Sequence, residues 1–204
     1  MNFELIDNLF QVATLGCAAA VALGLALRHR SRRLLILALS YACFSMGTLY
    51  YVLHLAIIGD IPRIFYVSEV SWLASYLCIL SLQILRAERL RFRVRPLPAI
   101  SAAVTALMIL HFRMLGPSYL MSLLFALTLG AIMYLCAFHL QSSPAHRETD
   151  VLLLACIALQ MLLYIISTFI KDYTRFNLYF AVDFVLTTSL AALLPLAQRE
   201  AAKR

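Results

Sequence analysis

Two carboxylic acids, Glu69 and Asp183, lie within stretches of sequence that are long and apolar enough to cross a bilayer. A charged side chain at the centre of a membrane costs at least about 2.5 kcal/mol, so an intramembrane acid usually faces neighbouring helices and has a partner. The sequence offers no Lys or Arg at a similar depth beside either acid. Each carboxyl group therefore carries a proton, pairs with His54 or Lys171, or meets a cation supplied by a ligand. The last two alternatives predict a site for a small basic ligand or for a proton.

Aromatic and polar residues accompany these acids at helical spacing. Trp72 and Tyr76 follow Glu69 at i+3 and i+7, which places all three on one helical face. Counting from the expected span ends, at about 1.5 Å per residue, puts the acids and their neighbours in the outer half of the membrane. The neighbours are His54, Tyr50, Trp72, Tyr76, Gln160, Tyr164 and Tyr179. We therefore predict an aromatic-lined, acidic ligand-binding pocket that opens to the outer side.

A purely structural interpretation competes with this pocket. Tyr and Trp side chains commonly lie at the membrane–water interface, and His54 is placed where an interfacial histidine would be. Ser and Thr hydroxyl groups often bond the backbone of their own helix. Glu69 and Asp183 could themselves form helix–helix hydrogen bonds and nothing more. Interfacial placement explains these two acids least well, because their side chains are too short and too deep to reach water easily.

The elements that must position these residues are membrane-spanning helices. Hydrophobic residues make up 63% of the 204-residue chain and charged residues only 13%, a composition typical of membrane proteins. Because a helix needs about 20 apolar residues to cross a bilayer, we predict an all-α bundle in one transmembrane domain, residues 1–204. Its seven spans are expected at about 9–27, 34–58, 64–85, 97–112, 117–140, 150–170 and 175–197. The fourth span is the shortest and follows two prolines.

The distribution of basic residues predicts the orientation of these spans. With the N-terminus outside, the cytoplasmic segments hold 13 of the 17 Lys and Arg residues. Cytoplasmic loops of membrane proteins carry such an excess, so we predict an outer N-terminus and a cytoplasmic C-terminus. The basic loops are also expected to contact anionic lipid, and they offer a surface for a cytoplasmic protein partner. The net charge of +7 is thus explained without nucleic acid.

The same assignment makes predictions about the remaining polar residues. It places Asp7 in the outer segment before the first span, and it places Arg86, Asp150 and Glu200 in cytoplasmic segments. The inner half of the membrane is therefore expected to contain few strongly polar side chains. Gln83 and His139, both near span ends, are the main ones. In the first span, Ala18, Ala22 and Ala26 are four residues apart, a spacing that allows close helix packing.

Three classes of function fit these patterns. We rank a binding or sensing module of the cell membrane first, because the acids and aromatic residues share one depth. The expected topology resembles that of bacterial seven-helix sensory modules, a likeness of topology and not of function. The alternative is a small transport component, with coupling to protons as one form of it. An intramembrane lipid-modifying enzyme ranks third, since the sequence has neither an HExxH metal motif nor a GxSxG nucleophile motif. We predict no metal or other cofactor, and no retinal in particular, because the seventh span lacks the lysine that a retinal Schiff base needs.

Overall fold

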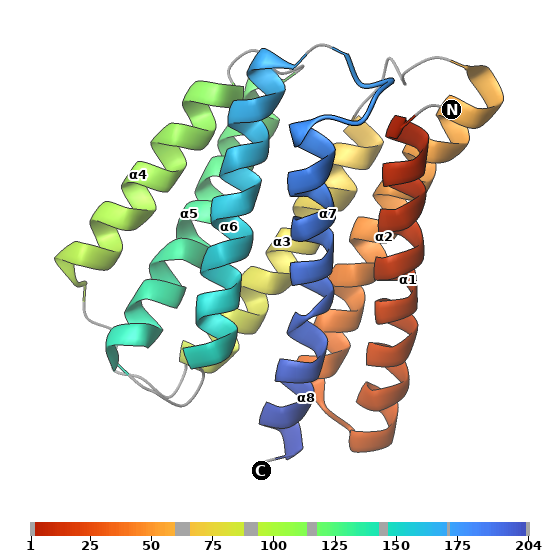
Figure 1. Cartoon of the computed structure of the whole chain (residues 1–204). Helices are drawn as coiled ribbons and strands as arrows, with labels where there is room; N and C mark the ends of the chain where they lie inside the picture. Colours follow the sequence, from red (N-terminus) through yellow and green to blue (C-terminus); the bar gives the residue numbers. More distant parts are fainter. Residues whose placement is uncertain are drawn as a thin grey trace.

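The computed structural model is a bundle of helices that run alternately in opposite directions (Figure 1). It describes residues 3–59, 66–87, 94–113, 118–142, 147–170 and 172–202. The helices are α1 (Phe3–His29), α2 (Arg32–Ile58), α3 (Tyr66–Ala87), α4 (Pro96–Arg113), α5 (Tyr119–Ser142), α6 (Arg147–Phe169), α7 (Leu178–Ala191) and α8 (Leu193–Ala202). The helix α8 continues in the direction of α7, and the two chain ends lie at opposite ends of the bundle. The predicted all-α bundle is confirmed.

Within the described residues, six helical segments are long and apolar enough to cross a membrane, so the chain is a multi-pass membrane protein. The helices α7 and α8 count as one of these segments, Leu178–Glu200. The helix α4 is apolar but shorter, over Pro96–Phe112, as its prolines and its short apolar run predict. The predicted spans thus follow α1 to α6 in order, with α7 and α8 together forming the last.

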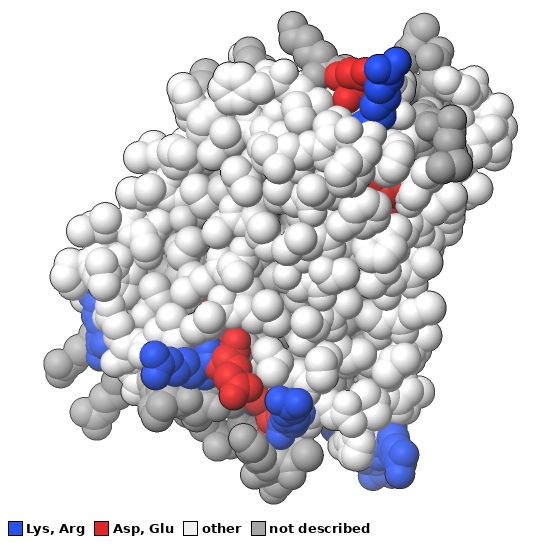
Figure 2. Space-filling view, in the orientation of Figure 1, with Lys and Arg blue, Asp and Glu red and all other residues white. Residues whose placement is uncertain are grey.

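Charged side chains gather toward the two ends of the bundle, with a mostly uncharged surface between them (Figure 2). We call the end at which α1 stops and α2 starts the inner end, and the opposite end the outer end. The described basic residues at the inner end are Arg28, Arg30, Arg32, Arg33, Arg86, Arg95, Arg147 and Arg199. Arg113, the last residue of α4, and Arg175, in the connection between α6 and α7, lie at the outer end. This asymmetry is the basis of the predicted orientation, with the inner end in the cytoplasm.

Small residues let the first three helices approach closely. Ala18, Ala22 and Ala26 are all buried, which matches the packing role that their spacing predicts. A Cβ atom at Gly47 of α2 would come within 2.8 Å of Ser71 Cβ on α3. The Ser68 hydroxyl group donates to the Gly47 carbonyl oxygen at 2.9 Å. This close contact fixes the outer half of α3, which carries Glu69, Trp72 and Tyr76, against α2.

The break between α7 and α8 has a specific cause. Pro195 lacks an N–H group, so it cannot donate to the carbonyl oxygen of Ala191, four residues earlier. The hydroxyl group of Tyr41, buried on α2, lies 2.7 Å from the Leu190 oxygen and 3.5 Å from the Ala191 oxygen. The Tyr41 hydroxyl group thus bonds the carbonyl next to Ala191 and also lies near the Ala191 oxygen that has lost its helical donor.

The helix α1 begins earlier than the sequence predicts, at Phe3 rather than near residue 9. Its first turn contains Glu4, an acid that the positive end of a helix favours. The Phe3 N–H group donates to the Thr174 carbonyl oxygen at 3.3 Å, and the Phe3 ring lies 5.4 Å from the Phe176 ring. These contacts dock the start of the chain on the α6–α7 connection. As a result, Asp7 lies within the bundle instead of in an outer segment.

Candidate functional site

The outer half of the bundle contains a cluster of two acids and one amide. Gln11 on α1 donates through Nε2 to Asp7 Oδ2 at 3.1 Å and to Asp183 Oδ2 on α7 at 2.8 Å. Asp7, Gln11 and Asp183 expose only 2%, 5% and 5% of their surface. The two carboxyl groups are also close enough to interact directly. One amide group therefore holds two acids from the first and the last span.

Hydrogen bonds extend this cluster toward α2 and α3. Thr48 Oγ1 lies 3.4 Å from Gln11 Oε1 and 3.2 Å from the Phe44 carbonyl oxygen, so its single proton serves one of them at a time. Trp72 donates through Nε1 to Thr48 Oγ1 at 3.1 Å. The indole of α3 is thus connected to Asp183 of α7 through Thr48 and Gln11. We call Asp7, Gln11, Thr48, Trp72 and Asp183 the outer cluster.

Three tyrosines and a second amide border the outer cluster. The Tyr76 hydroxyl group on α3 donates to Gln160 Oε1 on α6 at 2.6 Å. Tyr76 and Tyr179 are both close enough to Asp183 to interact with its charge. Tyr164 is close to both of these tyrosines. Polar groups from five helices, α1, α2, α3, α6 and α7, therefore meet in one region of the bundle.

The charge of the outer cluster is unbalanced. In the described part of the chain, neither Asp7 nor Asp183 forms an ion pair with Lys, Arg or His. Asp7 Oδ1 and the Thr187 hydroxyl group, one turn after Asp183, are buried without a hydrogen-bond partner. Two carboxylates that share one amide repel each other and lose their hydration, so ionising both requires a compensating charge. The arrangement can hold a proton between the acids or accept a cation.

The structure brings together some of the residues that the sequence singled out. Asp183, Trp72, Tyr76, Gln160, Tyr164 and Tyr179 all belong to the outer cluster or border it. Glu69 is buried, with 4% of its surface exposed, in the first turn of α3. Asp7, Gln11 and Asp183 form none of their hydrogen bonds with Glu69.

Two other predicted site residues lie outside the outer cluster. Tyr50 and His54 are half-buried on α2, with their ring centroids 6.2 Å apart. Asp183 accepts a hydrogen bond from Gln11, and the pairing of Glu69 with His54 stays a prediction. Lys171, the other suggested partner, lies outside the described residues.

Sequence reasoning missed Asp7, Gln11 and Thr48. Asp7 and Gln11 are four residues apart, and this i, i+4 pair of polar residues was the available signal of a helical face. A span predicted from a run of apolar residues begins only after these two polar residues, so the pair was assigned to the segment before the helix. Thr48 gives no such signal, since its partners come from other helices.

A second polar cluster lies at the inner end, where the sequence predicts few buried polar groups. Arg86 Nη1 of α3 lies 3.8 Å from Asp150 Oδ1 of α6, and Arg86 Nη2 donates to Glu200 Oε2 of α8 at 2.8 Å. His139 Nδ1 of α5 lies 3.5 Å from Asp150 Oδ1. Arg86, His139 and Asp150 are all buried. Arg86, Asp150 and Glu200 thus lie at the inner end, where the sequence places them, but they belong to helices and both acids contact Arg86. Their helices continue beyond the apolar windows, and the opposite charges compensate one another.

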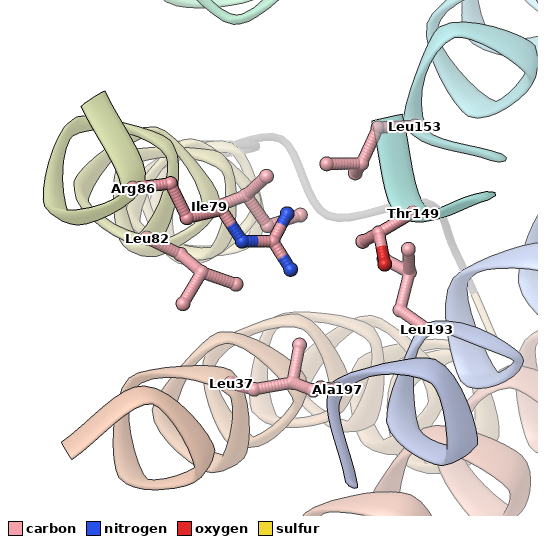
Figure 3. Close-up of a pocket in the computed structure, with 8 residues that line it drawn as sticks. All are labelled: Leu37, Ile79, Leu82, Arg86, Thr149, Leu153, Leu193 and Ala197. Atoms are coloured by element: carbon pink, nitrogen blue, oxygen red, sulfur yellow. The ribbon is translucent and has the colours of Figure 1, made fainter. Parts of the chain in front are cut away.

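A small cavity lies beside this cluster (Figure 3). The space in it that the centre of a water-sized sphere can reach is about 10 Å³. By the same measure, one water molecule needs about 10–15 Å³, so the cavity can hold one water at most. It is lined by Leu37, Ile79, Leu82, Arg86, Thr149, Leu153, Leu193 and Ala197. Figure 3 shows the Arg86 guanidinium group extending toward Thr149 across the space. This pocket lies at the inner end, whereas the predicted pocket was expected to open outward.

The helices α3 and α6 each contribute one residue to a pair in both polar regions, and the spacing between the two pairs is the same on both helices. Tyr76 pairs with Gln160 near the outer cluster, and Arg86 pairs with Asp150 at the inner end. The two pairs are ten residues apart on each helix, which corresponds to about 15 Å. The buried residues between them include Ile79 of α3 and Leu153 and Ile157 of α6. Gln83 is also buried there, and neither atom of its amide group has a hydrogen-bond partner.

Comparison with known proteins gives no match among protein-family models, curated proteins or solved structures. Within the described residues, no group of three or more His, Cys, Asp or Glu side chains is arranged to hold a metal ion. The chemistry of the two clusters is therefore argued from their own residues.

Proposed function

We propose that the outer cluster binds a small cation and that the protein is a binding or sensing module of the cell membrane. The observation that carries this proposal is the pair of buried acids, Asp7 and Asp183, on the single amide group of Gln11. A cationic ligand would supply the positive charge that the described surroundings of the pair lack. It would also remove the repulsion between the carboxylates.

The aromatic residues around the acids favour an organic cation over a simple metal ion. Trp72, Tyr76, Tyr164 and Tyr179 offer ring faces that attract a positive charge. Hard metal cations prefer several oxygen ligands, whereas this region combines two carboxyl groups with hydroxyl and indole groups. An amine or a quaternary ammonium ion would use both features. Glu69, Tyr50 and His54 remain proposed members of the site, nearer its outer edge.

Access from the outer side is consistent with the position of the acids. Asp7 is four residues from the start of α1, or about 6 Å along the helix, and Tyr179 is the second residue of α7. A ligand would therefore need to travel only about one helical turn from the outer end to reach the first acid. A pocket at this depth could take up a ligand from the outer side of the membrane.

Thermal unfolding of the purified protein with choline, putrescine or sodium chloride tests this proposal. A ligand at a hundredfold excess over its dissociation constant stabilises the native state by about 2.7 kcal/mol. We expect an organic cation to raise the unfolding temperature of the wild type, and Asp7→Asn or Asp183→Asn to remove that rise. Each Asn keeps an oxygen that can accept from Gln11, so the fold is preserved. Glu148→Gln, at an exposed acid of α6, is the matched control and should keep the full response. An equal response in all variants would refute the proposal.

Proton-coupled transport is a second candidate, because titratable groups occur at both ends of the α3–α6 contact. A transported proton would move between the outer acids and the His139–Asp150 pair across the apolar layer at Ile79. Proteoliposomes with a pH-sensitive dye inside and an imposed membrane potential test this function. We expect a flux that Asp183→Asn and Asp150→Asn each abolish if the protein is a transporter. A flux no greater than that of protein-free vesicles would exclude transport.

A further inference from the structure

The C-terminal helix α8 is held at the inner end by one acid. Glu200 accepts from Arg86 Nη2 of α3 through Oε2 at 2.8 Å, and from Thr149 Oγ1 of α6 through Oε1 at 2.6 Å. Both carboxylate oxygens are therefore occupied, by donors from two different helices. The apolar face of α8 contributes Leu193, Leu194 and Ala197, which are buried in the core.

The bond between Arg86 and Glu200 is closer than the contact between Arg86 and Asp150. The Arg86–Asp150 separation of 3.8 Å is beyond hydrogen-bonding distance. Arg86 Nε and Nη1 and both carboxylate oxygens of Asp150 are buried without a hydrogen-bond partner. Arg86 therefore lies between two acids. It forms a hydrogen bond with Glu200 of α8, and it faces Asp150 of α6 without one.

The other titratable groups around this contact come from neighbouring helices. His139 of α5 faces Asp150 at 3.5 Å, and Cys136, one turn earlier, lies within electrostatic range of Arg86 and Asp150. Arg95, which precedes α4, lies over the Phe138 ring and donates to Gln141. Arg86 and Thr149 both donate hydrogen bonds to Glu200.

We propose that Arg86, Thr149 and Glu200 form a lock that holds α8 against α3 and α6, completed by one water molecule in the adjacent cavity. The water would accept from the free N–H groups of Arg86 and donate to the Thr149 hydroxyl oxygen. The cavity of about 10 Å³ has room for one water and for little else. This inference concerns the inner end and does not depend on the function proposed for the outer cluster.

The lock gives α8 a docked state and a released state. When Glu200 loses its partners, Arg86 can move to Asp150, so release leaves no guanidinium group unpaired. Pro195 supplies the flexible point, because one helical hydrogen bond is missing there. Tyr41 holds the preceding carbonyl groups in place, so α7 remains docked while α8 moves. A change at the inner end can therefore alter the position of the C-terminal helix without unfolding the bundle.

Amide hydrogen exchange of the full chain in lipid nanodiscs tests the lock. Glu200→Gln keeps the shape of the side chain but removes its charge. Because charge-assisted hydrogen bonds are the stronger ones, we expect the amides of residues 196–200 to exchange at least about tenfold faster. Thr149→Val should give a smaller increase. Glu148→Gln, which changes an exposed acid beside Thr149, is the matched control and should leave these amides at the wild-type rate.

A second variant separates a specific lock from general loosening of the inner end. Asp150→Asn removes the competing acid while leaving Arg86 paired with Glu200, so α8 should exchange no faster than in the wild type. If Asp150→Asn and Glu200→Gln accelerate α8 equally, the contacts stabilise the inner end as a whole and the lock is refuted. Unchanged exchange of residues 196–200 in Glu200→Gln would refute it as well. Throughout, α1 amides report whether the bundle itself has stayed folded.

Discussion

Gln11 on α1 donates its amide Nε2–H to Asp183 on α7 at 2.8 Å, joining residues 172 positions apart in the chain. This hydrogen bond closes the bundle by connecting its first and last spans. The same amide group holds Asp7 on its own helix, so one side chain organises both acids of the outer cluster. Removing it would leave two buried carboxyl groups without their shared donor.

Gln11→Leu should therefore destabilise the protein by about 2–3 kcal/mol, the cost of leaving buried polar groups unsatisfied. Reversible unfolding in detergent, followed by helical circular dichroism, measures the difference. Gln198→Leu is the control, because Gln198 is exposed on α8 and should change stability by no more than about 0.5 kcal/mol. If both variants were equally stable, the shared amide group would not hold the acids in place.

Replacing Glu69 with Gln separates its charge from its packing. Gln nearly preserves the shape and still forms hydrogen bonds, so we expect Glu69→Gln to fold and insert like the wild type. If the ligand uses the charge of Glu69, its apparent affinity should fall at least about tenfold, measured as a smaller cation-induced rise in unfolding temperature. An unchanged response would assign the ligand's charge partner to Asp183 and leave Glu69 with a structural role.

Tyr41 and Pro195 should be energetically coupled, because the Tyr41 hydroxyl group lies 3.5 Å from the Ala191 oxygen, which the proline leaves without a helical donor. Tyr41→Phe alone should cost about 1 kcal/mol. In a Pro195→Ala background the helix can form its own hydrogen bond, so the same substitution should cost less. A double-mutant cycle measures the coupling, and strictly additive effects would contradict it.

The predicted orientation can be checked with reporter fusions. A reporter after Arg204 should be active in the cytoplasm, and one at Asp60 should be active outside, because 13 of the 17 basic residues lie in the segments assigned to the inside. An exterior C-terminus would mean that one predicted span does not cross. The short helix α4 would then be the first to re-examine.

The sequence alone determined the all-α bundle, the approximate spans, the short fourth helix and the basic end. These properties depend on local composition, since about 20 apolar residues suffice to predict a span and loop charge predicts its direction. The burial of Glu69 and Asp183 also followed, from the cost of exposing an acid to lipid.

Only the tertiary structure decided which groups meet. The helix α1 is 27 residues long, or about 40 Å, and so extends beyond a hydrocarbon layer of about 30 Å. Asp7 lies near the outer end of such a helix and Arg86 near the inner end of another. A prediction based on runs of apolar residues assigns both to loops. Each is buried beside a partner of suitable chemistry: Asp7 beside Gln11 of its own helix and Asp183 of α7, and Arg86 beside Glu200 of α8. The Arg86 partner is 114 positions away, and such a pairing depends on how helices pack, which no local window contains.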